Sequence, residues 1–557
     1  MSNPTHPRSR TTPVARSAGL LAPALVMALA LTACSGAADS RPPGSTGTQA
    51  APAPTPTWAA VTGTPRVIPS VRAFTPASGR GWRPSKGARI VVPAGEKSTL
   101  ADEAQLMAQD LGGLPVVWGD KTVRPGDIEL KLAGTQGASR PDDAAARSTA
   151  DEGYTLTARG TRLTLTAPTD AGIFYGTRTV RQAVRTAGGL PEGTIKDWPD
   201  RPQRGMSLDN ARKPFSADWI EARIKELGDL KLNQLQLHFS DDQGFRIESD
   251  THPEVVSPDH LTKDQVRHLI KVAQSRHVSL IPELDSPGHL GAVLAHHPDL
   301  VLRTADGRTV NGAIDISNPK SAQLIDSLLR EYAALFTNPK GSDAYWHLGG
   351  DEYQALMASN PESSYPQLAQ AARQKYGSGA TIQDLATGWL NDREKTVKAA
   401  GKNRIEAWND GFFSDGKVAA DKDRTVAYWT GKEIGKRDPS AFLHEGRNVL
   451  NVNDEYLYYV LGEPNGFVYP TGERIYRSWT PSVLRDTAPV AVPQKQTTPA
   501  RIPGGRFAIW ADQSQAQTPQ QIAAGIWLPL AALAQKTWNP GTPTMSWQSF
   551  KALANRI

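Results

Sequence analysis

The 557-residue sequence lacks three features that mark common protein classes. It contains one cysteine, Cys34, so no intramolecular disulfide can form. Its 62 basic and 56 acidic residues give a net charge of +6, and no cluster of lysine and arginine marks a nucleic-acid surface. No glycine-rich nucleotide loop follows the first strand expected in the C-terminal region. The chain does contain 39% hydrophobic residues and 14 tryptophans, and its length favours more than one folded domain.

The N-terminus has the pattern of an export signal. Basic residues precede an apolar run at residues 19–30, and the tetrapeptide LTAC ends at Cys34. LTAC resembles the lipobox of bacterial lipoproteins, so we expect residues 1–34 to be a lipoprotein signal peptide with Cys34 lipidated. An ordinary cleaved signal is the alternative. Residues 35–65, rich in Pro, Ser, Thr and Gly, are expected to form a tether. The expected location is the extracellular face of a bacterial membrane, lipid-anchored, or the secreted fraction.

Two patterns follow the tether. Residues 66–200 combine short strands with helices, and EGYTLTARGTRLTLTA alternates apolar and polar residues across a glycine turn, which predicts a hairpin. We expect a small, non-catalytic α+β domain there. In residues 201–557, eight short apolar segments alternate with amphipathic helices, which predicts an α/β fold of the (β/α)8 TIM-barrel type. A doubly wound open sheet is the alternative.

Acidic and aromatic residues follow the predicted strands of the C-terminal region. In YWHLGGDEYQ, two glycines end a strand and place Asp351 beside Glu352. Active sites of such barrels lie at the carboxyl ends of the strands. Adjacent carboxylates cannot easily lie on both sides of a glycosidic bond. They suit a mechanism in which one acid protonates the leaving oxygen while its neighbour orients a substrate acetamide that attacks the sugar carbon.

Four motifs in series carry a family resemblance. RGMSLDNAR, LNQLQLHFSDDQGFRIE, IPELDSPGH and HLGGDE closely resemble glycoside hydrolase family 20, the β-N-acetylhexosaminidases, and EGYTLTA and AGIFYGTRTVRQ resemble its non-catalytic domain. The resemblance covers about residues 66–540. It implies that Glu352 is the general acid/base and that Asp351 orients the acetamido N–H. It also implies that Tyr456 binds the acetamido carbonyl oxygen.

The resemblance also implies the walls of the sugar pocket. An aromatic box is expected from Trp408, Trp429 and Trp510. Arg204 is expected to hold the outer hydroxyls, and Asp241 to support the site. Asp285 and His289 are expected to orient Glu352. The resemblance implies no metal and no organic cofactor, and His296 and His297 lack a ligand set at helical spacing. The implied partners are N-acetylhexosamine-containing glycans, without nucleic acid and with the membrane reached only through the lipid.

Two departures from the family pattern bear on the substrate. Tyr458 and Asp512 stand where many members carry an acid and a longer glutamate that hold the terminal sugar. The lacto-N-biosidases, which release galactosyl-N-acetylglucosamine, are similar at these positions. The leading prediction is an exo-acting, retaining β-N-acetylhexosaminidase with an oxazolinium intermediate. A lacto-N-biosidase is the first alternative, and a glycan-binding lipoprotein without turnover is the second.

Overall fold

The computed structural model describes residues 59–119, 122–133, 144–337, 345–432 and 437–557. Within them, the chain from Ala59 to Ile557 forms one compact unit. The predicted signal peptide, Cys34 and most of the predicted tether lie outside the described residues, so those predictions stay predictions. No helix among the described residues is both long and apolar enough to cross a membrane.

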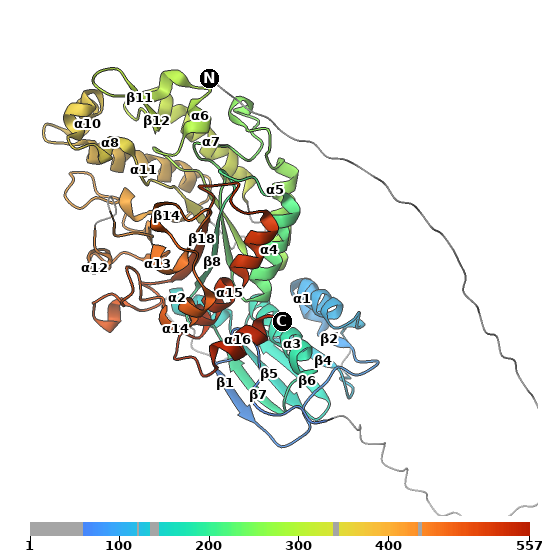
Figure 1. The fold of residues 1–557 in the computed structure, drawn as a ribbon. Helices are drawn as coiled ribbons and strands as arrows, with labels where there is room; N and C mark the ends of the chain where they lie inside the picture. The colour runs from blue at the N-terminus through green and yellow to red at the C-terminus, as the bar shows by residue number, and fades with distance from the viewer. Residues whose placement is uncertain (1–58, 120–121, 134–143, 338–344, 433–436) are drawn as a thin grey trace, which may run out of the picture. The chain divides into compact units, whose positions relative to one another are not determined.

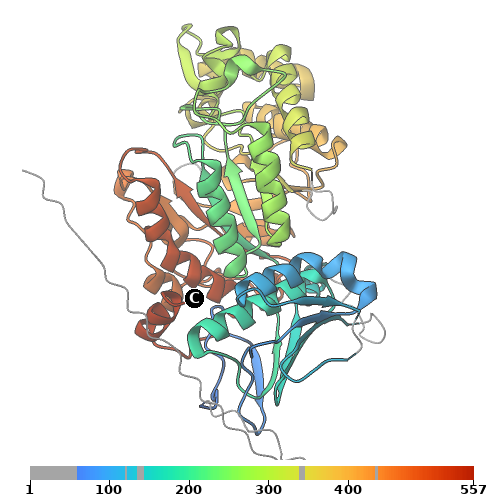
Figure 2. The ribbon, with the colours of Figure 1, turned by 90° about the vertical axis from the view of Figure 1, so that its right-hand side faces the viewer.

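A small domain with a mixed seven-stranded sheet comes first. Its strand order is β1-β7-β5-β6-β4-β2-β3. The predicted hairpin is present, with β5 and β6 antiparallel and Arg159 opposite Arg162 at the turn. Helices α1 and α3 pack together, and α3 covers β6 (Figure 2). The elements are β1 (Ala73–Pro76), β2 (Ile90–Val92), α1 (Lys97–Asp110), β3 (Val116–Trp118), β4 (Ile128–Leu132), α2 (Ala144–Asp151), β5 (Tyr154–Arg159), β6 (Arg162–Ala167), α3 (Asp170–Ala187) and β7 (Gly193–Asp197).

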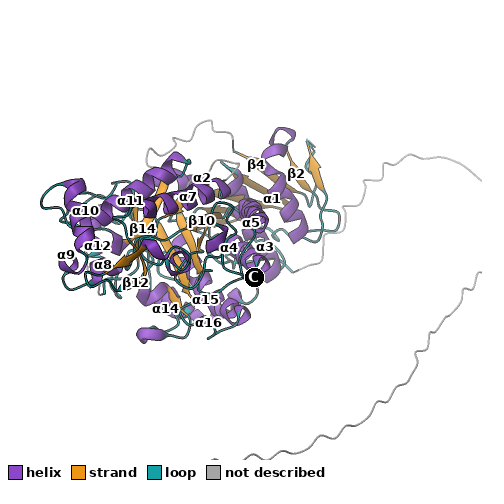
Figure 3. Cartoon of the chain, turned by 90° about the horizontal axis from the view of Figure 1, so that it is seen from above, coloured by secondary structure: helices purple, strands orange, loops and turns teal. Residues whose placement is uncertain are grey.

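The second domain is a closed parallel barrel, as the sequence predicts (Figure 1). The pairings between its described strands are parallel, and Asn451 paired with Gly505 closes the ring between β16 and β18. Seen from above, the strands lie inside the helices (Figure 3). The strands are β8 (Gln203–Asp209), β9 (Gln234–His238), β10 (Ser279–Glu283), β13 (Tyr345–His347), β14 (Arg404–Trp408), β15 (Thr425–Tyr428), β16 (Val449–Asn451), β17 (Tyr458–Val460) and β18 (Gly504–Trp510).

The helices around the barrel are uneven in length. Two long ones, α5 and α15, begin with capping boxes, in which Thr262 and Thr518 each bond reciprocally with a glutamine three residues on. Between β14 and β15 the described residues form only the short turn η4 (Asn409–Gly411). The helices are α4 (Ala217–Asp229), α5 (Lys263–Ser275), α6 (Gly291–Leu294), α7 (Pro319–Leu335), α8 (Gln354–Met357), α9 (Pro361–Ser364), α10 (Pro366–Tyr376), α11 (Ile382–Ala399), α12 (Pro439–His444), α13 (Asp454–Leu457), α14 (Gly472–Ser478), α15 (Pro519–Trp538) and α16 (Trp547–Ala554). A hairpin of β11 (Val301–Arg303) and β12 (Thr309–Ile314) lies between α6 and α7.

The outer and inner faces of the barrel strands carry different side chains. In β9, Leu235 and Leu237 join the large hydrophobic cluster outside the barrel. Gln236 alternates with them, and its amide donates to Glu283 at 2.6 Å. Because neighbouring side chains of a strand point to opposite faces, this alternation gives the barrel an apolar exterior and a hydrogen-bonded polar interior. The interior is therefore preorganised to hold charged groups beneath the strand ends.

The small domain attaches to the barrel at the amino ends of the strands. Trp538, the last residue of α15, is buried in the small-domain core, and its indole N–H donates to Asp197 at 2.9 Å. Lys231, just before β9, pairs with Asp197 at 3.1 Å and lies 4.4 Å from the Trp538 ring centroid. These contacts lie at the end of the barrel opposite to Asp351. The small domain thus supports the barrel without entering the candidate site.

Candidate active site

The carboxyl ends of the barrel strands bring together most of the predicted site residues. They come from the barrel strands or from the loops that follow them. Asp241 follows β9, and Asp285 and His289 follow β10. Asp351 and Glu352 follow β13. The aromatic contributions are Trp408 at the end of β14, Trp429 after β15, Tyr458 in β17 and Trp510 at the end of β18.

The loop after β13 needs its two glycines. Gly349 and Gly350 have φ of 67° and 93°, where side chains are disfavoured. A Cβ on Gly349 would lie 1.8 Å from Asp285 Oδ1, so a larger residue cannot fit there. The turn continues through Glu352, whose φ of 47° also lies in the left-handed region. This bend turns the adjacent Asp351 and Glu352 toward one site, which a continuous strand would not do.

Asp285 contacts Asp351 rather than Glu352. The Gly350 N–H donates to Asp285 Oδ1 at 2.8 Å. Asp285 Oδ2 and Asp351 Oδ1 are buried without a hydrogen-bond partner among the described residues, as two ionised acceptors would be. Burial, and then the charge of Asp351, raise the pKa of Asp285 well above its usual value. A proton on Asp285 therefore lets it donate a hydrogen bond to Asp351, which satisfies both carboxyl groups. Asp285 was expected to orient Glu352, and the structure corrects this to a role in holding Asp351.

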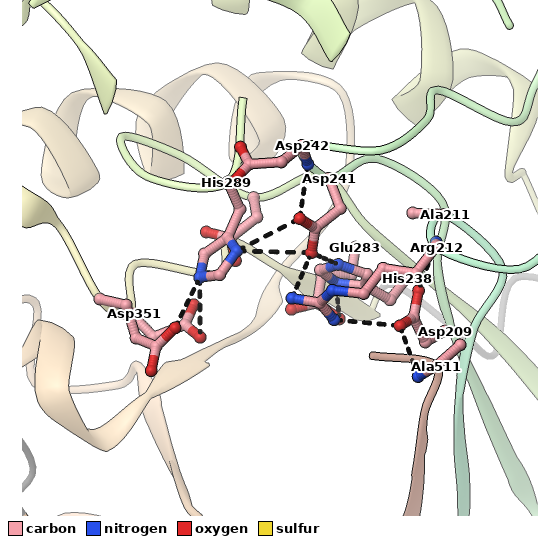
Figure 4. Close-up of polar contacts among 12 residues, drawn as sticks. Asp209, Ala211, Arg212, His238, Asp241, Asp242, Glu283, His289, Asp351 and Ala511 are labelled. Atoms are coloured by element: carbon pink, nitrogen blue, oxygen red, sulfur yellow. Dashed lines mark hydrogen bonds and ion pairs between the residues drawn. The ribbon is translucent and has the colours of Figure 1, made fainter. Parts of the chain in front are cut away.

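His289 connects the two catalytic candidates to a buried acid. Its Nε2 lies 3.4 Å from Glu352 Oε2 and 3.6 Å from Asp351 Oδ2, and its Nδ1 lies 3.4 Å from Asp241 (Figure 4). Although burial opposes the charge, Asp351 and Asp241 raise the pKa of His289 well above its usual value. The hydrogen bond from His289 is the main cause that lowers the pKa of Glu352. The Glu352 side chain is 42% exposed, which leaves it accessible to a substrate.

Beyond Asp241 lies a charged network that sequence reasoning missed. Arg212 contacts Asp241 at 2.8 Å and Asp209 at 3.0 Å. His238 bridges Asp241 at 2.9 Å and Glu283 at 3.1 Å (Figure 4). Although burial opposes ionisation, His289, His238 and Arg212 hold the pKa of Asp241 well below its usual range. Asp241 is thus a fixed negative charge behind His289.

The aromatic residues form one cluster at the barrel mouth. Trp408, Tyr458, Trp429 and Trp510 pack in it together with apolar residues of the neighbouring strands. Trp429 and Tyr458 are parallel, 5.7 Å apart, and Tyr458 lies 5.9 Å from Trp510. The Trp408 indole N–H donates to Glu283 at 2.7 Å, which fixes the orientation of the ring. The cluster provides flat apolar walls next to Asp351.

Arg204 does not lie in this site. It is the second residue of β8, fully buried at the opposite end of the strand. It pairs with Glu152 of the small domain at 2.7 Å, and its guanidinium donates to the carbonyls of Lys231 and Arg201. The prediction that Arg204 binds substrate is therefore wrong. The arginine at the site is Arg212, which follows the strand end in the same RGMSLDNAR motif and could have been found by the rule that strand ends carry the site.

Tyr456 also lies outside the barrel interior. It belongs to α13, packs in the outer hydrophobic cluster, and has the Arg474 guanidinium 4.4 Å from its ring centroid. Tyr458, two residues later, faces the interior in β17. Burial, and then the charges of Asp454 and Asp351, raise the pKa of Tyr458 well above its usual value. The structure thus corrects the predicted tyrosine from Tyr456 to Tyr458.

Asp512 lies at the exposed edge of the site. Its charge, with those of Asp209 and Asp241, raises the pKa of Arg212 against the effect of burial. A sugar hydroxyl bound to Arg212 would therefore also come near Asp512. The position fits the predicted substrate contact, which stays a prediction.

Four groups of side chains among the described residues have the composition of metal ligands. Asp285, His289 and Asp351 form one, inside the site. Outside it, His252 and His297 each lie 3.1 Å from the same oxygen of Glu254. Nothing in the sequence links His297 to His252 and Glu254, because they follow different strands.

Comparisons with known proteins agree on one family. The model of glycosyl hydrolase family 20, catalytic domain, matches residues 202–541, and that of its domain 2 matches residues 64–198. The lacto-N-biosidase of Bifidobacterium bifidum is 30% identical over 88% of this chain and 41% of its own length. A β-hexosaminidase of Vibrio furnissii is 27% identical over 65% of this chain and 62% of its own length. The chain thus spans less than two thirds of either relative.

Solved structures show the same fold. A chitobiase from Flavobacterium johnsoniae superposes with a TM-score of 0.69 at 21% identity, covering 88% of this chain and 71% of that one. A β-N-acetylhexosaminidase of Streptomyces coelicolor superposes with a TM-score of 0.67 at 23% identity, covering 88% of this chain and 95% of that one.

Proposed function

The chain belongs to glycosyl hydrolase family 20, and from that premise we propose that it hydrolyses terminal β-linked N-acetylhexosamine residues with retention of configuration. The observation that carries the proposal is the arrangement of Asp351 and Glu352. Both come from one bent loop and meet the same His289, yet Asp351 faces a buried acid and Glu352 faces solvent. Such a pair suits two different tasks on one substrate.

In the first step, Glu352 gives its proton to the leaving glycosidic oxygen. Asp351 accepts a hydrogen bond from the acetamido N–H, which directs the acetamido carbonyl oxygen to the anomeric carbon. The bond to the leaving group breaks as the carbon–oxygen bond of the oxazolinium ring forms. In the second step, Glu352 removes a proton from a water that opens this ring. Two attacks on opposite faces return the β configuration.

The other residues prepare these steps. Tyr458 lies near Asp351, so its hydroxyl is suited to donate to the acetamido carbonyl. The three tryptophans and Tyr458 wall the space in which the acetamide must fold back. Arg212 presents a charge fixed by Asp209 and Asp241 to sugar hydroxyls. His289 and Asp241 set the charge around Glu352 between the two steps.

A specific observation favours a second candidate, release of a disaccharide. The relative with 30% identity over 88% of this chain carries the name lacto-N-biosidase. Asp512 also stands where many family members carry a longer glutamate that holds a single terminal sugar. Hydrolysis of an aryl lacto-N-bioside and of an aryl N-acetyl-β-glucosaminide, followed by product analysis, separates the two. Faster release of the disaccharide supports a lacto-N-biosidase, and cleavage of only the monosaccharide substrate supports a β-N-acetylhexosaminidase.

The decisive test of the mechanism uses Glu352→Gln. This variant keeps the shape of the side chain and loses the proton, so hydrolysis of substrates with poor leaving groups should fall at least a hundredfold. NMR of the wild-type reaction should show the β anomer first. An initial α anomer, or a fully active Glu352→Gln variant, contradicts the proposal. Failure on both aryl substrates would support a glycan-binding protein without turnover.

A further inference from the structure

Asp410 is a buried acid that the mechanism above does not use. It lies in η4, the turn that replaces a longer helix after β14, and is 5% exposed. Its Oδ2 accepts the backbone N–H of Glu352 at 2.9 Å. Its Oδ1 accepts the indole N–H of Trp429 at 3.0 Å. One carboxyl group therefore bonds to both the catalytic loop and the aromatic wall.

The bond to Glu352 acts on a backbone that needs support. Glu352 has φ of 47°, a left-handed conformation that disfavours any residue with a Cβ. Its side chain is 42% exposed and lies 3.4 Å from His289. The hydrogen bond from its N–H to Asp410 is a short contact that fixes the loop from beneath. Without it, the loop could relax and move the carboxyl group away from the leaving oxygen.

The bond to Trp429 acts on the opposite side of the site. The Trp429 ring is parallel to Tyr458, and in this orientation its indole N–H reaches Asp410. Two N–H donors on two different oxygens require a group with two acceptor oxygens, which a carboxylate has and a carboxamide does not. Asp410 therefore has a chemical reason to be an acid.

The charge of Asp351 acts on Asp410, and Asp410 in turn acts on Tyr458. Burial, and then the charge of Asp351, raise the pKa of Asp410 to about 7. The protein thus keeps an acid at position 410 although burial of the Asp410 charge is unfavourable. A carboxyl group with only a packing role could be replaced by an apolar side chain without that cost.

We propose that Asp410 is a positioning residue, which fixes the acid/base Glu352 and the wall residue Trp429 relative to each other through its two oxygens. The inference rests on the proposed function of Glu352. It predicts that Asp410 affects turnover through Glu352, by placing its carboxyl group over the leaving oxygen.

A double-mutant cycle on the full chain tests this. Asp410→Asn keeps one acceptor and turns an amide N–H toward the other donor, so kcat for a phenyl N-acetyl-β-glucosaminide should fall roughly ten- to a hundredfold. The 2,4-dinitrophenyl glycoside needs little acid assistance, so Asp410→Asn should lower kcat for this substrate at most threefold. Asp410→Asn added to Glu352→Gln should cost no further activity. The matched control, Asp415→Asn, changes an exposed acid of the same loop and should leave kcat within twofold.

The outcomes separate the two proposals. If Glu352→Gln keeps full activity, the proposed function fails. If Glu352→Gln is impaired, two results make the inference fail. In the first, Asp410→Asn lowers the activity of the Glu352→Gln variant by the same factor as that of wild type. In the second, Asp410→Asn slows both leaving groups equally. Either result means that Asp410 does not act through Glu352. Should Asp410→Asn not fold, Asp410→Ser takes its place in the same cycle.

Discussion

Changing Asp285 to asparagine should leave substantial activity, although Asp285 is buried next to Asp351. Its Oδ1 accepts the Gly350 N–H at 2.8 Å, and its other oxygen faces Asp351. Because burial and Asp351 raise the pKa of Asp285, the group is a neutral acid that donates to Asp351. Asparagine offers the same acceptor and an N–H donor in the same positions.

The size of the effect follows from the charges. Two carboxylates 4 Å apart repel each other by about 4 kcal/mol at an effective dielectric constant near 20. A carboxyl oxygen of Asp285 lies within 4.8 Å of one of Asp351, so a repulsion of about this size acts between them. That repulsion keeps the proton on Asp285. Asparagine cannot ionise, so in the variant no second negative charge forms next to Asp351. We therefore expect kcat of Asp285→Asn within about tenfold of wild type. Asp285→Leu, which loses the donor to Asp351 and the acceptor for Gly350, should lose at least a hundredfold, or about 2.7 kcal/mol.

Stability should depend on pH in a matching way. Because the folded pKa of Asp285 lies above its unfolded value, the folded state binds the proton more tightly. The stability from Asp285 is present at low pH and is lost as the pH rises toward the folded pKa. Asp285→Asn lacks this loss, so its Tm relative to wild type should rise between pH 4 and pH 8. Equal inactivation by Asn and Leu, or a Tm difference that does not change with pH, would refute the reasoning.

Three further predictions follow from the site. His289→Gln removes the hydrogen bond that lowers the pKa of Glu352, so the basic limb of the kcat/KM profile should move to higher pH; a limb that stays in place or moves lower contradicts this role. Tyr458→Phe should lower kcat about ten- to a hundredfold through loss of one hydrogen bond to the reacting acetamide, whereas Tyr456→Phe should stay within twofold; the reverse order would restore Tyr456 to the site. Cys34→Ala should abolish incorporation of labelled fatty acid in the native host, and wild-type protein that never takes up label would exclude the lipoprotein.

The sequence predicted the fold because the signals were local and repeated. Each barrel strand has its own apolar run, and each motif lies next to its own strand end, so the order of elements could be read without distances. The same locality identified Asp351 and Glu352 from a glycine pair and two adjacent acids. Asp241, Asp285 and His289 were placed at the site by the rule that strand ends meet at one rim.

Tertiary structure alone decided the residues whose role depends on direction or on distant partners. Arg204 and Asp209 lie in the same strand, but five residues at about 3.3 Å each separate them by about 16 Å, so the motif that contains both spans two ends of the barrel. Between Tyr456 and Tyr458, α13 ends and β17 begins, so the alternation of a strand does not apply and only Tyr458 turns inward.

Asp410 shows the same limit most clearly. In the sequence it is one acid among 56, in a loop without a motif, and 58 residues separate it from Glu352. The sequence by itself determined the strand order, the strand ends and the catalytic pair, because each depends on neighbours along the chain. The side that each residue faces, and the bond from Asp410 to Glu352, depend on how the strands close into a barrel, and only the tertiary structure fixes that.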